Sequence, residues 1–236
     1  MRYPIIDAIR GTALVGMMIF HANYMLEEVF GVMNFHFSDQ FWFLLGRGVA
    51  IIFIIVAGVS FSLSIKNKTS IQILVGTFRR FFLLAGLAGI ISIVTFSIMY
   101  EQRISFGIIH FFAFASICSL LFLRLEKLSI ILGVGIIFLG KYLATLITDV
   151  TYLFPLGITA STYFSADYYP LFPWFGYYLI GYGSAYYLTK YGVFDRFFSS
   201  SIPGTKILEF FGRNSLLVYS IHVPIIYVIL FFIFLR

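Results

Sequence analysis

The stretch that decides the fold of this chain is Tyr3-Pro4-Ile5-Ile6-Asp7-Ala8-Ile9-Arg10-Gly11, which continues as an apolar run to His21. The run is long enough to cross a bilayer, yet it contains an acid, an arginine and a histidine. On a helix, these three side chains fall within roughly 60–80° of one another, and Arg10 and His21 lie about 16 Å apart along the axis. Charge inside a membrane is costly and is usually retained for function, so this polar stripe predicts a functional site along the first helix.

The composition is typical of a polytopic membrane protein. The chain is 61% hydrophobic and 11% charged, with a mean hydropathy of +0.98, whereas soluble domains carry about 25% charged residues. We expect a single transmembrane domain over residues 1–236. The net charge of +6 indicates basic cytoplasmic loops and contact with anionic lipid rather than with nucleic acid. Cys118 is the single cysteine, which excludes an intrachain disulfide.

Apolar runs of about twenty residues predict an all-α integral membrane fold, a bundle of about seven transmembrane helices. The polar and Tyr-rich stretch 149–169 is predicted to be a loop or an interfacial segment. Lysine and arginine gather at the N-terminus and in every second connection, which predicts a multi-pass protein of the cell membrane with its N-terminus cytoplasmic and its C-terminus outside. The predicted spans lie near 4–25, 41–65, 80–100, 105–123, 128–148, 170–190 and 214–235.

Three of the four histidines are predicted to lie at the depth of the outer leaflet. His21 is near the outer end of the first span, His36 is in the loop that follows, and His110 is in the first turns of the fourth span. His21 and His110 lie inside predicted spans, where ionisable groups are usually functional, and together with His36 of the outer loop they are our candidate catalytic residues. The alternative is that each is a hydrogen-bonded anchor at the interface. His222 is predicted about two turns into the last span from the cytoplasmic side.

The intramembrane charges leave two interpretations open. Asp7 and Arg10 are one helical turn apart and can pair. They form either an internal salt bridge near the cytoplasmic interface or a site where Arg10 binds an anion from the cytosol. Arg47 is about two turns into the second span, where it faces the bundle or reaches outward to Asp39 or a lipid phosphate.

The motifs of several enzyme classes are missing from the sequence. It contains no HExxH and no close cluster of His and Asp at ligand spacing, so we predict no metal site. It also lacks GxSxG, which argues against a serine hydrolase. The aromatic run from Tyr168 to Trp174 is either an interfacial belt or an outer vestibule that stacks on a sugar ring.

Five motifs occur in order along the chain. They are Ile6-Asp7-Ala8-Ile9-Arg10-Gly11 followed by His21, Gly46-Arg47 with Phe53-Ile54-Ile55-Val56-Ala57-Gly58-Val59-Ser60, Phe106-Gly107-Ile108-Ile109-His110, Tyr169-Pro170-Leu171-Phe172-Pro173-Trp174-Phe175-Gly176, and Gly212-Arg213-Asn214-Ser215-Leu216-Leu217-Val218-Tyr219-Ser220-Ile221-His222. In this order the chain resembles the small prokaryotic members of the heparan-alpha-glucosaminide N-acetyltransferase catalytic-domain family. The spacing of Arg10 and His21 is also similar to the first-helix motif of the broader acyltransferase family three.

The resemblance implies a membrane-embedded acyltransferase. It implies that acetyl-CoA binds from the cytosol and that the acyl group passes to a sugar amine or hydroxyl on the far side. The expected partners are therefore a coenzyme A thioester, a carbohydrate or glycolipid acceptor and the lipid bilayer, and an oligomer is possible. In the lysosomal enzyme a catalytic histidine lies in the outer loop after the first helix, and His36 is the closest match to it. A histidine acts here as a general base or as a covalent acyl carrier.

Roles for the remaining candidates follow from this chemistry. Coenzyme A carries several phosphates, for which Arg and Lys are suitable partners. We expect donor contacts from Asp7, Arg10, Arg79, Arg80 and Arg213, and acceptor contacts from Arg47, Asp167, Trp174, Asn214 and His222.

Two rival functions stay open. One is a small transporter or lipid flippase that uses the polar face of the first helix as a translocation path, and the other is a non-catalytic membrane subunit.

Overall fold

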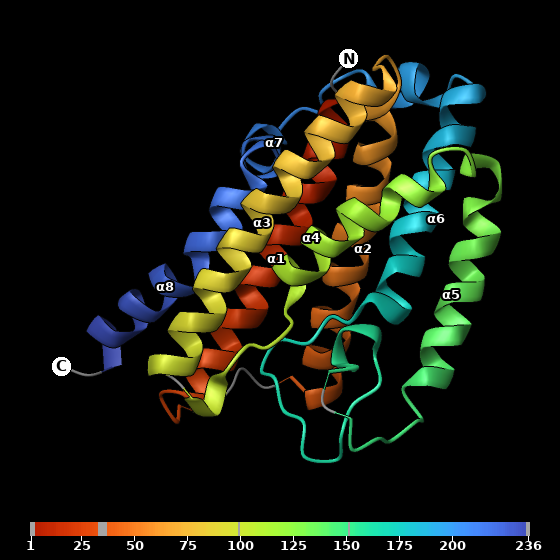
Figure 1. Cartoon of the computed structure of the whole chain (residues 1–236). Coiled ribbons are helices and arrows are strands. Elements are labelled where there is room, and N and C mark those ends of the chain that lie inside the picture. Colours follow the sequence, from red (N-terminus) through yellow and green to blue (C-terminus); the bar gives the residue numbers. More distant parts are fainter. Residues whose placement is uncertain (1–2, 33–36, 99, 151, 235–236) are drawn as a thin grey trace. The chain divides into compact units, whose positions relative to one another are not determined.

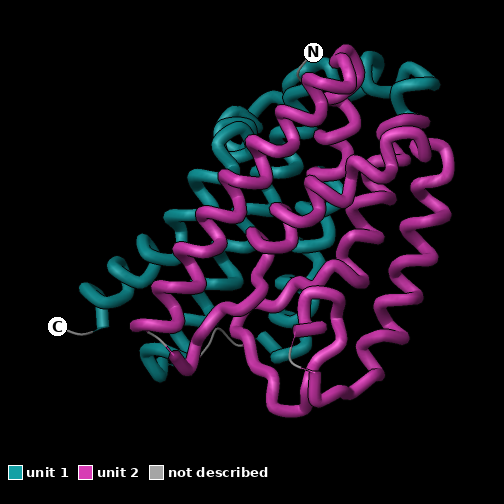
Figure 2. The backbone as a smooth tube through the Cα atoms, viewed as in Figure 1, with its two compact units in different colours: residues 1–56, 188–236 teal, residues 57–187 magenta. Residues whose placement is uncertain are grey.

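The computed structural model describes residues 3–32, 37–98, 100–150 and 152–234, which fold into helices joined by loops (Figure 1). These ranges contain no strand, only isolated bridges that pair Phe106 with Tyr168 and Ile147 with Thr159. The all-α prediction is therefore confirmed for the described part of the chain. The backbone divides into two compact units, residues 1–56 with 188–236 and residues 57–187 (Figure 2). The single transmembrane domain over 1–236 stays a prediction.

Unit 1 is built around α1 (Pro4–Glu28). A proline in the first turn is well suited to a helix start, because the N–H that it lacks would have had no partner there. The unit also contains α2 (Asp39–Ile65) as far as residue 56, the π-helical turn η5 (Phe194–Phe198), α7 (Lys206–Arg213) and α8 (Ser215–Phe234). Both α7 and α8 contact α1, whose Leu14 and Met17 are buried.

Two glycines bring the backbones of α1 and α7 into direct contact. A Cβ added at Gly11 would collide with the backbone of Leu208, and a Cβ added at Gly212 would collide with the backbone of Asp7. Only glycine permits so close an approach, as it does between helices of membrane proteins. The first two turns of α1 and the two turns of α7 are thus held together.

Unit 2 contains the rest of α2, and α6 (Leu171–Lys190) as far as residue 187. Its α5 (Ser129–Leu143) and α6 approach closely where a Cβ on Gly133 would collide with the carbonyl of Gly176, and a Cβ on Gly176 with the carbonyl of Gly133. Tyr178 and Tyr182 of α6 are buried, and their rings contact Phe61. Its other elements are α3 (Ser70–Ile98), η1 (Tyr100–Gln102), α4 (Ile108–Cys118), η2 (Ser119–Phe122), η3 (Glu126–Leu128), α5 (Ser129–Leu143) and η4 (Phe154–Leu156).

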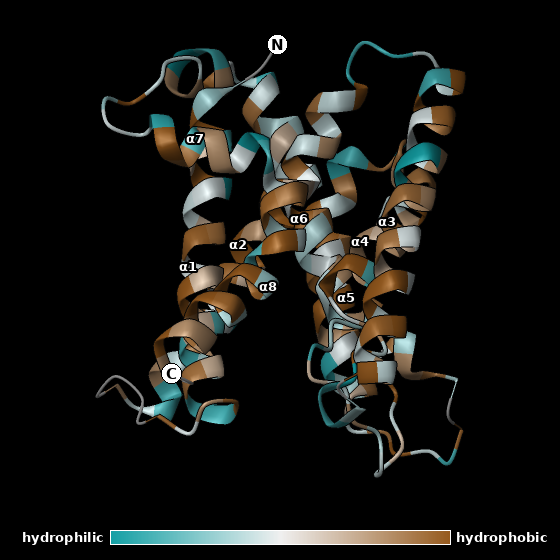
Figure 3. Ribbon diagram, turned by 90° about the vertical axis from the view of Figure 1, so that its left-hand side faces the viewer, coloured by the Kyte–Doolittle hydropathy of each residue, from teal (hydrophilic) through white to brown (hydrophobic). Residues whose placement is uncertain are grey.

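The surfaces of the long helices are apolar. Hydrophobic residues dominate the middle parts of α1 and α3, and hydrophilic residues gather in the loops (Figure 3). On α3, for example, Phe82 is 68% exposed. A helix that exposes so many apolar side chains is stable only where lipid surrounds it, which agrees with a membrane protein.

By length and composition, four described helices are able to cross a membrane, namely α1, α2, α3 and α8. The number is five if Ile108–Phe122 and Glu126–Leu143, which meet at a 115° bend, count as one broken span. The predicted seven spans are therefore not confirmed. The differences lie at 105–123, 128–148 and 170–190. α6 is not among the four helices that are long and apolar enough. α4 has 11 residues and α5 has 15. At 1.5 Å per residue these helices are about 17 and 23 Å long, short of a ~30 Å hydrocarbon core.

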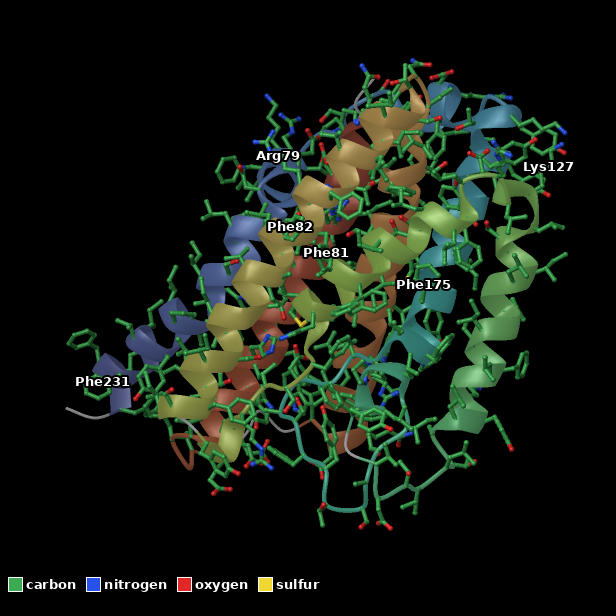
Figure 4. All side chains as sticks on the ribbon, viewed as in Figure 1. Arg79, Phe81, Phe82, Lys127, Phe175 and Phe231 are labelled. Atoms are coloured by element: carbon green, nitrogen blue, oxygen red, sulfur yellow. The ribbon has the colours of Figure 1, made fainter. Side chains whose placement is uncertain are left out.

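The stretch 149–169 is irregular, as predicted, with turns and the short η4 in its described part. The basic residues Arg79 and Lys127 both extend outward from the upper part of unit 2 in Figure 4. The cytoplasmic position of the N-terminus stays a prediction from the distribution of such residues.

Candidate functional site

The polar stripe of α1 contains the salt bridge that its spacing predicts. Arg10 Nη1 lies 3.1 Å from Asp7 Oδ1, one turn away on the helix. Asp7 is buried, and 17% of the Arg10 side chain is exposed. The local i,i+3 geometry is sufficient for this pair, so it was accessible from sequence.

α7 completes a charged cluster, by which we mean Asp7, Arg10, Glu209 and Arg213. Arg10 Nη1 also donates to the carbonyl of Gly212 at 3.1 Å. Arg213 Nε lies 3.6 Å from Asp7 Oδ2, and its Nη2 lies 3.0 Å from Glu209 Oε2. Two carboxylates face two guanidiniums, so the formal charges of the cluster cancel. Such compensation is what the interior of a membrane protein requires.

Glu209 is the member of this cluster that sequence reasoning missed. It is buried, and it accepts hydrogen bonds from the hydroxyls of Ser201 and Thr205. The bond from Ser201, followed by those from Thr205 and the Arg213 guanidinium, lowers the pKa of the Glu209 carboxyl. Its i,i+4 spacing to Arg213 was the available sequence signal.

A histidine pair, His21 with His222, lies further along α1. His222 Nε2 is 3.1 Å from His21 Nδ1, and the ring centroids are 4.9 Å apart. His222 is 3% exposed. The sequence grouped His21 with the other outer histidines and placed His222 towards the opposite side. The structure brings the two histidines together because α7 lies beside the first turns of α1. α8 therefore begins further along α1, closer to the level of His21.

The positions of these contacts along the chain explain why His21 of α1 and His222 of α8 are neighbours. Gly212 contacts the Asp7 and Arg10 end of α1, and His222 follows it by ten residues. His21 follows Arg10 by eleven residues on one helix, so it lies about 16 Å beyond the charged cluster at 1.5 Å per residue, and His222 of α8 contacts it at that level. α1 and α8 therefore run in the same direction, with the charged cluster at one end and the histidine pair at the other.

The backbone carbonyls around the histidine pair decide where its protons lie. Tyr219 O is 2.6 Å from His222 Nδ1, and Met17 O is 3.1 Å from His21 Nδ1. A carbonyl only accepts, so both Nδ1 atoms carry hydrogen. In neutral His222 the Nε2 atom is then an acceptor, and the His21 Nδ1–H is shared between Met17 O and this atom. His21 Nε2 is left as a lone pair, with no hydrogen bond to the described residues.

His110 has a different environment in unit 2. Its Nδ1 accepts from the Gly107 N–H at 3.2 Å, so the neutral ring carries its proton on Nε2 and donates it to Ser92 Oγ at 3.1 Å. The Ser92 hydroxyl in turn donates a hydrogen bond to the Ile104 carbonyl at 2.7 Å. Both nitrogens of His110 are therefore used to shape the N-terminus of α4.

Asp167 binds at the same helix start. Its Oδ2 accepts from the Ile108 N–H at 2.9 Å, and a Cβ on Gly107 would collide with the carboxyl. Burial raises the pKa of the Asp167 carboxyl from 3.8 to about 6, and the Ile108 hydrogen bond lowers it in part. The structure thus brings Asp167 and His110 together, which the sequence did not predict.

The remaining candidates have the following contacts. The Arg47 guanidinium lies 4.8 Å from the centroid of the Phe43 ring. Trp174 is buried, with its ring centroid 4.7 Å from that of Tyr169. Asn214 joins α7 to α8 and donates from Nδ2 to the Phe210 carbonyl at 2.9 Å. Arg79 and Arg80 are exposed on α3.

The last two predictions concern His36 and the absence of a metal site. His36 lies outside the described residues. Within the described ranges, no group of three or more His, Cys, Asp or Glu is arranged to hold a metal ion.

Apolar membrane-length helices, a compensated charged cluster and a buried histidine pair define a membrane protein with an internal polar site. The family described as heparan-alpha-glucosaminide N-acetyltransferase, catalytic, matches residues 2–224, and the chain belongs to this family. Membership confirms the resemblance read from the five motifs and indicates a membrane acetyltransferase. Comparisons with curated proteins and with solved structures found no match.

Proposed function

We propose that this protein transfers an acetyl group from cytosolic acetyl-CoA to a sugar amine or hydroxyl at or beyond the outer leaflet, with His21 as general base. The proposal rests on family membership and on one observation, the histidine pair. Its hydrogen bonds fix His21 in the tautomer whose Nε2 lone pair is available to take a proton. A correctly oriented neutral imidazole is the usual base for such a step.

The proposed reaction balances within these groups. The acceptor nitrogen or oxygen attacks the thioester carbon, and its proton moves to His21 Nε2. The carbon–sulfur bond then breaks, and the coenzyme thiolate leaves with the proton that His21 returns. In the alternative route, a histidine, with His36 as the other candidate, first becomes acetylated and then gives the acetyl group to the acceptor.

The contacts within the charged cluster reduce the number of residues that we assign to acetyl-CoA binding. Arg10 is held by Asp7 and by the Gly212 carbonyl, so we assign Asp7 and Arg10 to maintaining the cluster. Arg213 keeps 43% of its side chain exposed, and we propose that it contacts a coenzyme phosphate. Arg79 with Arg80 is a separate candidate in unit 2, to be tested on its own.

His110 takes a positioning role in this proposal. Since both of its ring nitrogens are in hydrogen bonds that shape the α4 N-terminus, we assign it to holding that segment together with Asp167. Arg47, Trp174 and Asn214 stay candidates for acceptor contacts. His36, which lies outside the described residues, stays a candidate base or acyl carrier.

The test is acetyl transfer in proteoliposomes, with labelled acetyl-CoA on the side of the N-terminus and amino-sugar or glycolipid acceptors on the other side. His21→Ala should lower turnover by about 10²–10⁴, the usual contribution of a positioned acid–base group, with little change in coenzyme binding. Ser220→Ala, which removes a hydroxyl that donates to the Leu216 carbonyl of the same helix, is the control, and it should keep the wild-type turnover. Full activity in His21→Ala refutes the base assignment.

The same assay distinguishes the rival functions and the two chemical routes. Acceptor flux that does not require acetyl-CoA contradicts an acyltransferase and supports a transporter. Label that stays on the protein when acceptor is left out identifies the covalent route.

A further inference from the structure

We propose that His222 is the positioning residue of His21 and also takes up the proton that His21 removes from the acceptor. This rests on the proposed function for its chemical context. Its geometric basis is the 3.1 Å contact of His222 Nε2 with His21 Nδ1 and the 2.6 Å contact of His222 Nδ1 with Tyr219 O.

The positioning role follows from the two carbonyls. Tyr219 O requires the hydrogen of His222 on Nδ1, so Nε2 of the neutral ring is an acceptor directed at His21. That acceptor, together with Met17 O, keeps the hydrogen of His21 on Nδ1. The other tautomer of His21 would leave two lone pairs facing each other and would place the hydrogen on the atom that must act as base.

The proton-accepting role follows from the same arrangement. When His21 Nε2 gains a proton, the imidazolium that forms already donates from Nδ1 to His222 Nε2. Transfer of the Nδ1 proton leaves His21 neutral with hydrogen on Nε2, and His222 becomes the imidazolium, still bonded to Tyr219 O. The reverse transfer restores the resting pair when the thiolate is protonated. No proton is lost, and no further reactant is required.

A histidine is better suited to this position than an acid. A carboxylate beside His21 would carry a permanent charge at a site where His222 is buried in a membrane helix, and such a charge is costly. An imidazole is neutral at rest and charged only while the proton is held. The ring is also immobilised, because contacts with His21 and with Tyr219 hold both of its sides.

The test compares His222→Gln with His222→Phe. A glutamine can accept the His21 Nδ1–H through Oε1 and so keep the tautomer, but it takes up no proton. We expect His222→Gln to lower kcat about tenfold to hundredfold with the KM for acetyl-CoA unchanged, and His222→Phe to lower it further. The proton inventory in mixed H₂O and D₂O should change from curved in the wild type to linear in His222→Gln. A wild-type kcat with a curved inventory in that variant overturns the proposal.

The matched control is Ser220→Ala, two residues away on α8, where the hydroxyl donates to the Leu216 carbonyl. It should keep the wild-type kcat. Thermal melting of each variant separates lost folding from lost chemistry.

A spectroscopic measurement tests the pair without turnover. ¹⁵N NMR of histidine-labelled wild-type protein in nanodiscs should show hydrogen on His21 Nδ1 and a hydrogen-bond coupling to His222 Nε2. A His21 ring with hydrogen on Nε2 overturns the inference, whatever the enzyme does. If the coupling is present but no acceptor is ever acetylated, the proposed function fails while the pair stands.

Discussion

Replacing Gly212 by alanine tests whether close backbone contact between α1 and α7 builds the charged cluster. A Cβ at this position collides with the backbone of Asp7, which is part of a helix and cannot turn aside as a side chain would. The two helices must therefore separate. That movement also lengthens the 3.1 Å hydrogen bond from Arg10 Nη1 to the Gly212 carbonyl.

The expected cost has three terms. Overpacking costs about 1–3 kcal/mol, and loss of a hydrogen bond to a charged group costs about 1.5–3 kcal/mol. Alanine offsets roughly 0.5–1 kcal/mol of this, because glycine is a poor helix former. Gly212→Ala should therefore destabilise the protein by about 2–5 kcal/mol, which corresponds to a fall in melting temperature of roughly 5–20 °C for a chain of this size.

The assay is thermal unfolding of purified protein in one detergent, with Gly135→Ala as the matched control. A Cβ at Gly135 of α5 has no atom within 4 Å. The control should therefore keep the wild-type melting temperature or raise it slightly. If Gly212→Ala melts with the wild type, the backbone contact does not hold α7 in place and the reasoning is wrong.

Two further predictions concern charged groups outside the long helices. The pKa of Asp167 is raised to about 6 in the folded protein, so its contribution to stability is present below pH 3.8 and is lost as the pH rises through 6. At 1.36 kcal/mol per pKa unit, this loss of stability is at most about 3 kcal/mol. The loss is smaller than this upper limit because Asp167 is only half-buried. Asp167→Asn should remove that loss, so melting at pH 4.5 and pH 7.5 should show a smaller difference in the variant than in the wild type, and equal differences would contradict the assignment. Arg213→Gln should weaken acetyl-CoA binding in calorimetry by about ten- to hundredfold, whereas Lys206→Gln, an exposed charge on the same helix, should not, and an unchanged Kd in Arg213→Gln removes this residue from the donor site.

Local sequence accounts well for α1 and α2, whereas α3 was predicted near 80–100 and begins ten residues earlier, at Ser70. α1 was predicted near 4–25 and is Pro4–Glu28, and α2 was predicted near 41–65 and is Asp39–Ile65. The length of an apolar run is a property of consecutive residues, so it predicts such helices directly. The bend after Phe122 was missed because the apolar runs on both sides look like ordinary spans.

The sequence by itself determined the all-helical membrane class, the family and the Asp7–Arg10 salt bridge, since each depends on composition, on ordered motifs or on spacing within one helix. Only the tertiary structure decided that Glu209 and Arg213 complete the charged cluster and that His222 pairs with His21 across 201 positions of the chain. Helical periodicity defines the face on which a side chain lies, but it does not say which distant helix meets that face. Here the meeting is decided by Gly11 and Gly212, whose missing side chains let α7 lie against α1 and so place α8 in register with His21.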